Sequence, residues 1–177
     1  MNRPKVSVFL GLSLDGYIAG EGGDLSWLSI VQTDPPEDTG FDALMRDVDV
    51  MVFGRNTYDT ALAFEAWPYA SKRVVVLTHR ALRPRHGEEV HAGPLVDLLA
   101  SLGQAGHRHV YLDGGGVTRE GLAAGVVDEL TLSWLPVILG KGIPLFASGL
   151  SMSRWHLAQS RAFASGLVQA RYVPAPG

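Results

Sequence analysis

Apolar segments with the character of β-strands alternate with helix-like segments along the chain as far as Gly125. Strands are expected at residues 5–14, 50–53, 73–78 and 109–112, with a short one near Val90, and helices at 27–32, 41–47, 57–64, 94–102 and 117–124. Several strand segments are almost continuously apolar, which is typical of parallel strands buried on both faces. The alternation predicts a parallel sheet covered by helices.

After Gly125 the helical segments stop. Residues 129–136 are strand-like, and residues 137–146 are apolar and interrupted by glycine. Residues 155–164 and 167–173 alternate like the two arms of a hairpin around Ser165-Gly166. We therefore expect one α/β domain over residues 1–177, with a mostly parallel central sheet and antiparallel strands at its C-terminal end.

Composition narrows the functional classes. The chain has 177 residues, 46% of them hydrophobic, and a net charge of −3, which fits one globular domain and gives no basic stripe for nucleic acid. The absence of cysteine excludes disulfides and thiolate catalysis, and the six histidines show no metal-ligand spacing, so no metal is expected. Without a signal peptide or an apolar segment of membrane length, we expect a cytoplasmic protein with no membrane partner.

Two strand-to-helix junctions contain glycine and are candidate phosphate sites. The residues concerned are Gly54, Arg55, Asn56 and Thr57 at the first junction, and Gly114, Gly115, Gly116, Val117 and Thr118 at the second. Glycine permits close approach of a ligand to the backbone, and the first N–H groups of a helix bind anions. Together the junctions predict a dinucleotide site. The alternatives are a glycine-rich turn and a helix cap beside a solvated arginine.

Polar residues at other strand ends are expected beside the same cleft. Thr78, His79 and Arg80 follow the strand at 73–78, where His79 or Arg80 can meet a 2′-phosphate and favour NADPH over NADH. Asp15 follows the first strand and can line this edge. The alternatives are a polar strand exit and a tight Asp-Gly turn. Asp38 precedes a helix, whose positive end a carboxylate favours.

Five segments in this order resemble the dihydrofolate reductase-like superfamily, and most closely the C-terminal reductase domain of the bifunctional riboflavin-biosynthesis deaminase/reductase. They are SLDGYIA at 13–19, VFGRNTY at 52–58, VVVLTHR at 74–80, VYLDGGG at 110–116 and DELTLSWLPVILGKGIPLF at 128–146. The resemblance implies a three-layer dihydrofolate reductase-like fold, an NADPH-dependent reductase and a homodimer.

The resemblance also implies roles for individual residues. Gly54 to Thr57 correspond to a cofactor loop, Thr78 to Arg80 lie near the adenosine 2′-phosphate, and Gly114 to Gly116 face the pyrophosphate. The nicotinamide is expected near the first strand, close to Leu12, Ser13 and Asp15. Tyr17 and Trp27 are candidate walls of the substrate pocket, with a core position as the alternative.

The chain departs from the riboflavin enzyme in two respects. It has no cysteine and therefore no P-C-x-x-C motif, which excludes the deaminase chemistry, and it has no Ala-Asp-Asp-Pro segment after the second strand. Asp38 stands near the position of the carboxylate that binds the pterin in dihydrofolate reductases.

We expect hydride transfer from NADPH to a C=N or C=O bond of a small heterocyclic or sugar-linked substrate, as in 5-amino-6-(5-phosphoribosylamino)uracil reductase. Asp15, Asp38 or water would supply the proton. The alternatives are dihydrofolate reductase itself and a nucleotide-binding module without turnover.

Overall fold

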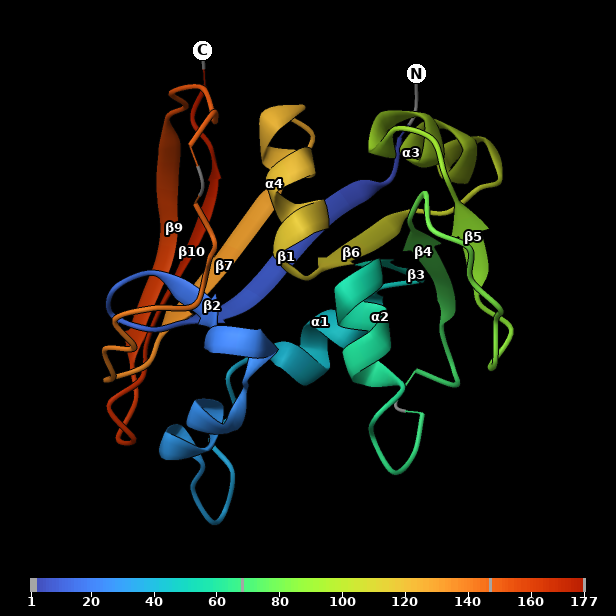
Figure 1. Ribbon diagram of the computed structural model, residues 1–177. Helices are drawn as coiled ribbons and strands as arrows, with labels where there is room; N and C mark the ends of the chain where they lie inside the picture. Colours follow the sequence, from blue (N-terminus) through green and yellow to red (C-terminus); the bar gives the residue numbers. More distant parts are fainter. Residues whose placement is uncertain (1–2, 68, 147, 177) are drawn as a thin grey trace.

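The computed structural model describes residues 3–67, 69–146 and 148–176 (Figure 1). Its main sheet has eight strands in the order β5-β4-β3-β6-β1-β7-β10-β9. The strands of this sheet are β1 (Lys5–Leu12), β3 (Val50–Gly54), β4 (Arg73–Leu77), β5 (Glu89–His91), β6 (His109–Asp113), β7 (Glu129–Trp134), β9 (Trp155–Ala162) and β10 (Val168–Pro174). A separate antiparallel pair consists of β2 (Tyr17–Ala19) and β8 (Ile143–Pro144).

The direction of the strands confirms the predicted sheet. Every pairing from β5 across to β7 is parallel, whereas β10 is antiparallel to both β7 and β9. The β9–β10 hairpin forms one end of the sheet (Figure 1). A parallel centre brings the carboxyl ends of β1, β3, β4 and β6 to one edge, where open α/β sheets bind ligands.

Helices cover both faces of the sheet and produce the three layers expected from the resemblance. The α-helices are α1 (Phe41–Asp47), α2 (Arg55–Ala61), α3 (Leu95–Gln104) and α4 (Gly115–Ala123). Val50 and Val52 of β3 belong to the core cluster that contains α3 and Val117 of α4, whereas Met51 and Phe53 belong to the cluster that contains Tyr58 of α2. Alternate residues of one strand thus enter opposite cores, which explains the continuous apolar segments.

Several predicted boundaries were wrong because local polar contacts or glycine set the ends. The first strand ends at Leu12 rather than at residue 14, since Ser13 begins a turn in which the Gly16 N–H donates to the Ser13 carbonyl oxygen (3.0 Å). Helix α2 begins at Arg55 and ends at Ala61, earlier than predicted at both ends, and α4 begins at Gly115. The segment near Trp27 is a 3₁₀-helix, Ser26–Val31, preceded by another at Glu21–Gly23.

A third, smaller core lies just beyond the carboxyl end of β7. Trp27 packs there with Leu135, Phe163 and Leu167, and it is 9% exposed. This core holds the 3₁₀-helix Ser26–Val31 against the β9–β10 hairpin, and so it fixes the segment that leads into α1.

Candidate functional site

A cleft of about 880 Å³ opens at the carboxyl ends of the central parallel strands. Residues 78–80, which follow β4, are called the β4 exit. The cleft is lined by residues of both predicted glycine junctions and of this exit: Gly54, Arg55, Asn56, Thr57, Thr78, His79, Gly114, Gly115, Gly116 and Val117. Other residues of the lining come from β1, β2, α4 and β8, from the 3₁₀ segments and from the region after α2. Segments that are distant in the sequence therefore meet in one cavity of the size that ligand sites have.

The two glycine junctions touch each other. Gly114 has a φ of 99°, and a Cβ atom there would lie 2.0 Å from Thr57 Oγ1. A Cβ atom on Gly115 would lie 2.4 Å from Ile18 Cδ1, whereas a Cβ atom on Gly116 would meet no atom within 4 Å. Gly114 is therefore required by its backbone conformation and by its contact with Thr57, whereas a side chain at Gly115 would need the ends of Ile18 and Arg119 to move. Of these three glycines, Gly116 alone leaves open space at the cleft.

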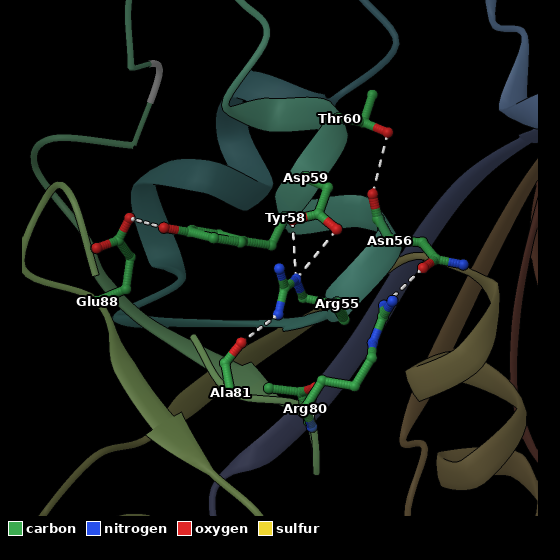
Figure 2. Close-up of polar contacts among 9 residues, drawn as sticks. Arg55, Asn56, Tyr58, Asp59, Thr60, Arg80, Ala81 and Glu88 are labelled. Carbon is green, nitrogen blue, oxygen red and sulfur yellow. Dashed lines mark hydrogen bonds and ion pairs between the residues drawn. The ribbon is translucent and has the colours of Figure 1, made fainter. Parts of the chain in front are cut away.

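The β4 exit is joined to the start of α2 by arginine side chains (Figure 2). Arg80 Nη2 donates to Asn56 Oδ1 (2.9 Å), and Arg55 Nη1 donates to the Ala81 carbonyl oxygen (2.8 Å). Arg55 also pairs with Asp59, one helical turn further along α2 (2.8 Å). These contacts hold Arg55 in the lining of the cleft and Arg80 next to it, behind Asn56. Guanidinium groups so placed can bind phosphate oxygens.

A buried hydrogen bond fixes the other side of α2. The Tyr58 hydroxyl donates to Glu88 Oε1 (2.8 Å; Figure 2). Glu88 Oε2 accepts from the backbone N–H groups of Arg85 and His86. Burial raises the pKa of Tyr58 to about 12, with the Glu88 carboxylate adding to the shift. Tyr58 is fully buried, so this pair anchors α2 to the loop before β5.

Asp113 is a titratable residue of the cleft that was not predicted from the sequence. It ends β6 immediately before the three glycines, and it lines the cleft. Burial raises the pKa of Asp113 to about 6, against an ordinary value of 3.8, although the Gly114 N–H partly offsets the effect. A polar residue directly after the apolar strand predicted at 109–112 was the available signal, but no role was predicted for Asp113.

Asp15 has contacts of a different kind. Its carboxylate accepts from Ser13 Oγ (2.6 Å) and from the N–H groups of Leu139 (3.1 Å) and Gly140 (2.7 Å). The Ser13 hydrogen bond, with help from these N–H groups, lowers the pKa of Asp15. Asp15 thus holds the loop after β7 against the end of β1 and stays ionised near neutral pH.

The remaining predicted site residues lie outside the lining of the cleft within the described part of the chain. Leu12, Ser13 and Thr118 are buried, and Trp27 belongs to the third core. Tyr17 pairs with β8, Asp38 is exposed and accepts from the Gly40 N–H (2.8 Å), and Arg80 reaches the cleft only through Asn56. Their functional roles stay predictions.

The described residues offer neither a membrane span nor a metal cluster. Among them, no helix has both the length and the apolar character needed to cross a membrane. No group of three or more His, Asp or Glu side chains in the described ranges comes together in a way that could hold a metal ion.

Comparison with known proteins decides the family. Residues 4–169 match the family described as RibD C-terminal domain. The chain belongs to this family. A crystal structure from Shewanella sp. PV-4, a protein assigned provisionally to riboflavin biosynthesis, superimposes with a TM-score of 0.91 at 37% identity and covers 97% of this chain and 99% of that one. YwjB of Bacillus subtilis (strain 168), an uncharacterized protein, is 28% identical over 97% of this chain and 98% of its own length.

More distant structures share the fold of this RibD C-terminal domain. The deaminase/reductase of Thermotoga maritima has a TM-score of 0.72 at 19% identity, covering 98% of this chain and 57% of that one. Dihydrofolate reductase from Enterococcus faecalis has a TM-score of 0.68 at 15% identity, with 97% of each chain covered. The dihydrofolate reductase-like fold is therefore confirmed, within a family of NADPH-dependent reductases.

Proposed function

We propose that this RibD C-terminal domain is an NADPH-dependent reductase that reduces a C=N or C=O bond of a small heterocyclic substrate. The observation that carries the proposal is the cleft in which both glycine junctions, the β4 exit and Asp113 meet. Membership of a reductase family supports the same conclusion.

The pyrophosphate, the 2′-phosphate and the nicotinamide of NADPH would lie in different parts of the cleft. Gly116 and Thr57 would lie beside the pyrophosphate, since Gly116 leaves open space there. Arg80 and His79, at the β4 exit, would lie beside the 2′-phosphate and favour NADPH over NADH. The nicotinamide would then lie toward Gly11 of β1 and Asp113 of β6, which line the same cleft.

Bound NADPH supplies the hydride, and the chain must supply the proton. Asp113 is suited to this task, because a carboxyl group with a pKa of about 6 is protonated in an appreciable fraction of molecules near neutral pH. Asp15 is poorly suited, because its hydrogen bonds lower its pKa. Asp38 is exposed, and dihydrofolate reduction through Asp38 is correspondingly less well supported.

A turnover assay separates the reductase from a nucleotide-binding module that has no activity. Oxidation of NADPH would be followed for wild type and Asp113→Asn against a panel of heterocycles with reducible C=N or C=O bonds. We expect turnover with at least one compound, and a lower kcat in the variant with unchanged NADPH affinity. Tight NADPH binding with no turnover across the panel would favour the binding module.

A further inference from the structure

A second cavity, of about 350 Å³, lies on the α1 side of the sheet. Its lining comes from α1 and the residues before it, from β1, β6 and β7, and from both strands of the β9–β10 hairpin. We call it the hairpin cavity. Phe9 is the one residue that it shares with the cleft at the strand ends, within the described parts of the chain. Its volume lies at the lower end of the range for small-molecule sites.

Four neighbouring strands place their side chains in one row across the floor of the hairpin cavity. Phe9 of β1 is paired with Thr131 of β7, Thr131 with Arg171 of β10, and Arg171 with Gln159 of β9. Directly paired residues point to the same face of a sheet. All four residues line the hairpin cavity, so the sheet itself sets their spacing.

The two arginines of the hairpin cavity are diagonal neighbours. Arg161 of β9 is paired with Gln169, which stands two residues before Arg171 on β10, so the two guanidinium groups are within reach of one small ligand. Arg161 Nη1 donates to the Asp38 carbonyl oxygen (3.0 Å). Among the described residues no acid forms an ion pair with Arg161, although Glu37 lies near enough to feel its charge.

Positive charge exceeds negative charge in the lining of the hairpin cavity. The charged residues are Lys5, Arg161 and Arg171 on one side of the balance, and Asp47 and Glu129 on the other. Glu129 Oε2 accepts from both Lys5 Nζ and Arg171 Nη1, each at 3.2 Å. His109 also lines the cavity, and burial, followed by the charge of Lys5, lowers its pKa, so it is neutral near pH 7.

Two polar groups of the hairpin cavity have no partner within the described residues. Arg171 Nε is buried and makes no hydrogen bond. Thr131 is only 6% exposed, and its hydroxyl forms no hydrogen bond with any of these residues. Gln169 Nε2 donates to Ser133 Oγ (2.9 Å), which leaves the amide oxygen of Gln169 available. Because buried polar groups are normally paired, these groups indicate a ligand that supplies their partners.

We propose that the hairpin cavity binds a small organic anion, with its carboxylate or phosphate group between Arg161 and Arg171. Oxygen atoms placed there would offset the repulsion between the two guanidinium groups and would accept from Arg171 Nε. Hydroxyl groups on the rest of the ligand would contact Thr131, Gln159 and Gln169. The site is separate from the cleft, and the inference does not depend on the proposed reductase function.

A matched ligand series tests the inference directly. Sorbitol, gluconate and sorbitol 6-phosphate share a six-carbon polyol, which is neutral in the first and carries a carboxylate or a phosphate in the others. Binding to the full chain would be measured by calorimetry and located by amide shifts in ¹⁵N spectra. We expect one or both anions to bind at least about tenfold more tightly than sorbitol, a difference of about 1.4 kcal/mol, with shifts at Thr131, Gln159 and Arg171.

The stronger of the two anions identifies the charged group that the site accepts. Binding of neither anion at millimolar concentration would overturn the inference. Shifts confined to Gly54 and Gly116, in the cleft, would also overturn it.

Three variants provide a second test. Arg161→Gln is expected to weaken binding of the preferred anion at least about tenfold, because it removes a charged donor. Thr131→Val removes only the hydroxyl, keeps the shape of the side chain and is expected to weaken binding severalfold. Arg154→Gln removes the same charge as Arg161→Gln at an exposed position outside the cavity lining, and is expected to change nothing.

Equal effects of Arg161→Gln and Arg154→Gln would contradict the inference. NADPH affinity is measured in parallel and is expected to be the same in all three variants. Failure of NADPH to bind would overturn the proposed function alone, whereas failure of the anions to bind would overturn this inference alone.

Discussion

Three consecutive glycines at the start of α4 have different roles. Gly114 is required by its positive φ and by contact with Thr57, whereas a Cβ atom on Gly115 would meet the flexible ends of Ile18 and Arg119. Gly116 has neither constraint, although it also lines the cleft. The sequence motif predicted one function for all three, whereas the structure separates Gly114, which the fold needs, from Gly116, which ligand binding can use.

Alanine substitutions separate these roles. Gly114→Ala is expected to lower the free energy of unfolding by about 2–4 kcal/mol, because the residue would be strained at positive φ and would collide with Thr57. Gly116→Ala is expected to leave stability unchanged or raise it by up to about 1 kcal/mol, since alanine favours the helix, while weakening NADPH binding. Urea unfolding and fluorescence titration measure the two effects. Normal NADPH affinity in Gly116→Ala would argue against cofactor contact at this residue.

The raised pKa of Asp113 makes stability depend on pH. Because the folded chain holds this proton more tightly than the unfolded chain, the contribution is favourable below 3.8 and is lost as the pH rises through about 6. Asp113→Asn removes the buried charge, and we expect it to be more stable than wild type above that range. Urea titrations at several pH values measure the difference. A variant that is less stable at mildly alkaline pH would show that the Asp113 carboxylate is not penalised by burial.

At the scale of elements, the sequence was enough to predict the central strands but not the contacts of the segments that follow them. Strands β3, β4 and β6 are apolar at nearly every position, because both faces are buried, and so their pattern identified them. The start of α2 depends instead on Arg80 and Ala81, which lie 24 and 26 residues along the chain from their partners Asn56 and Arg55. Contacts of this kind leave no periodic signal. The same reason explains why the cleft-facing position of Asp113 was not predicted.

Helix α2 depends on its buried anchor to the loop before β5. Tyr58→Phe removes the hydroxyl that donates to Glu88 and leaves a buried carboxylate oxygen without that donor. We expect a loss of about 1–3 kcal/mol in the free energy of unfolding. Tyr172→Phe is the matched control, because the Tyr172 hydroxyl makes no side-chain hydrogen bond with the described residues, and it is expected to have a smaller effect. Similar losses in both variants would mean that the Tyr58–Glu88 pair contributes little.

At the scale of the whole molecule, the homodimer stays a prediction that rests on the resemblance. The chain has a mass of 19.0 kDa, so sedimentation equilibrium is expected to give twice this value. A species of 19.0 kDa at micromolar concentration would contradict the expected dimer and would leave the account of the cleft unchanged, because the cleft is lined by residues of one chain.

The cleft as a whole is the basis of the functional account, and cofactor selectivity tests that account most directly. NADPH and NADH would be titrated separately into the purified protein, with binding followed by intrinsic tryptophan fluorescence. The account predicts tight binding of NADPH and much weaker binding of NADH, with Arg80→Ala reducing the difference between them. Failure of both nucleotides to bind at millimolar concentration would contradict it, and the glycine junctions would then serve only the packing of the fold.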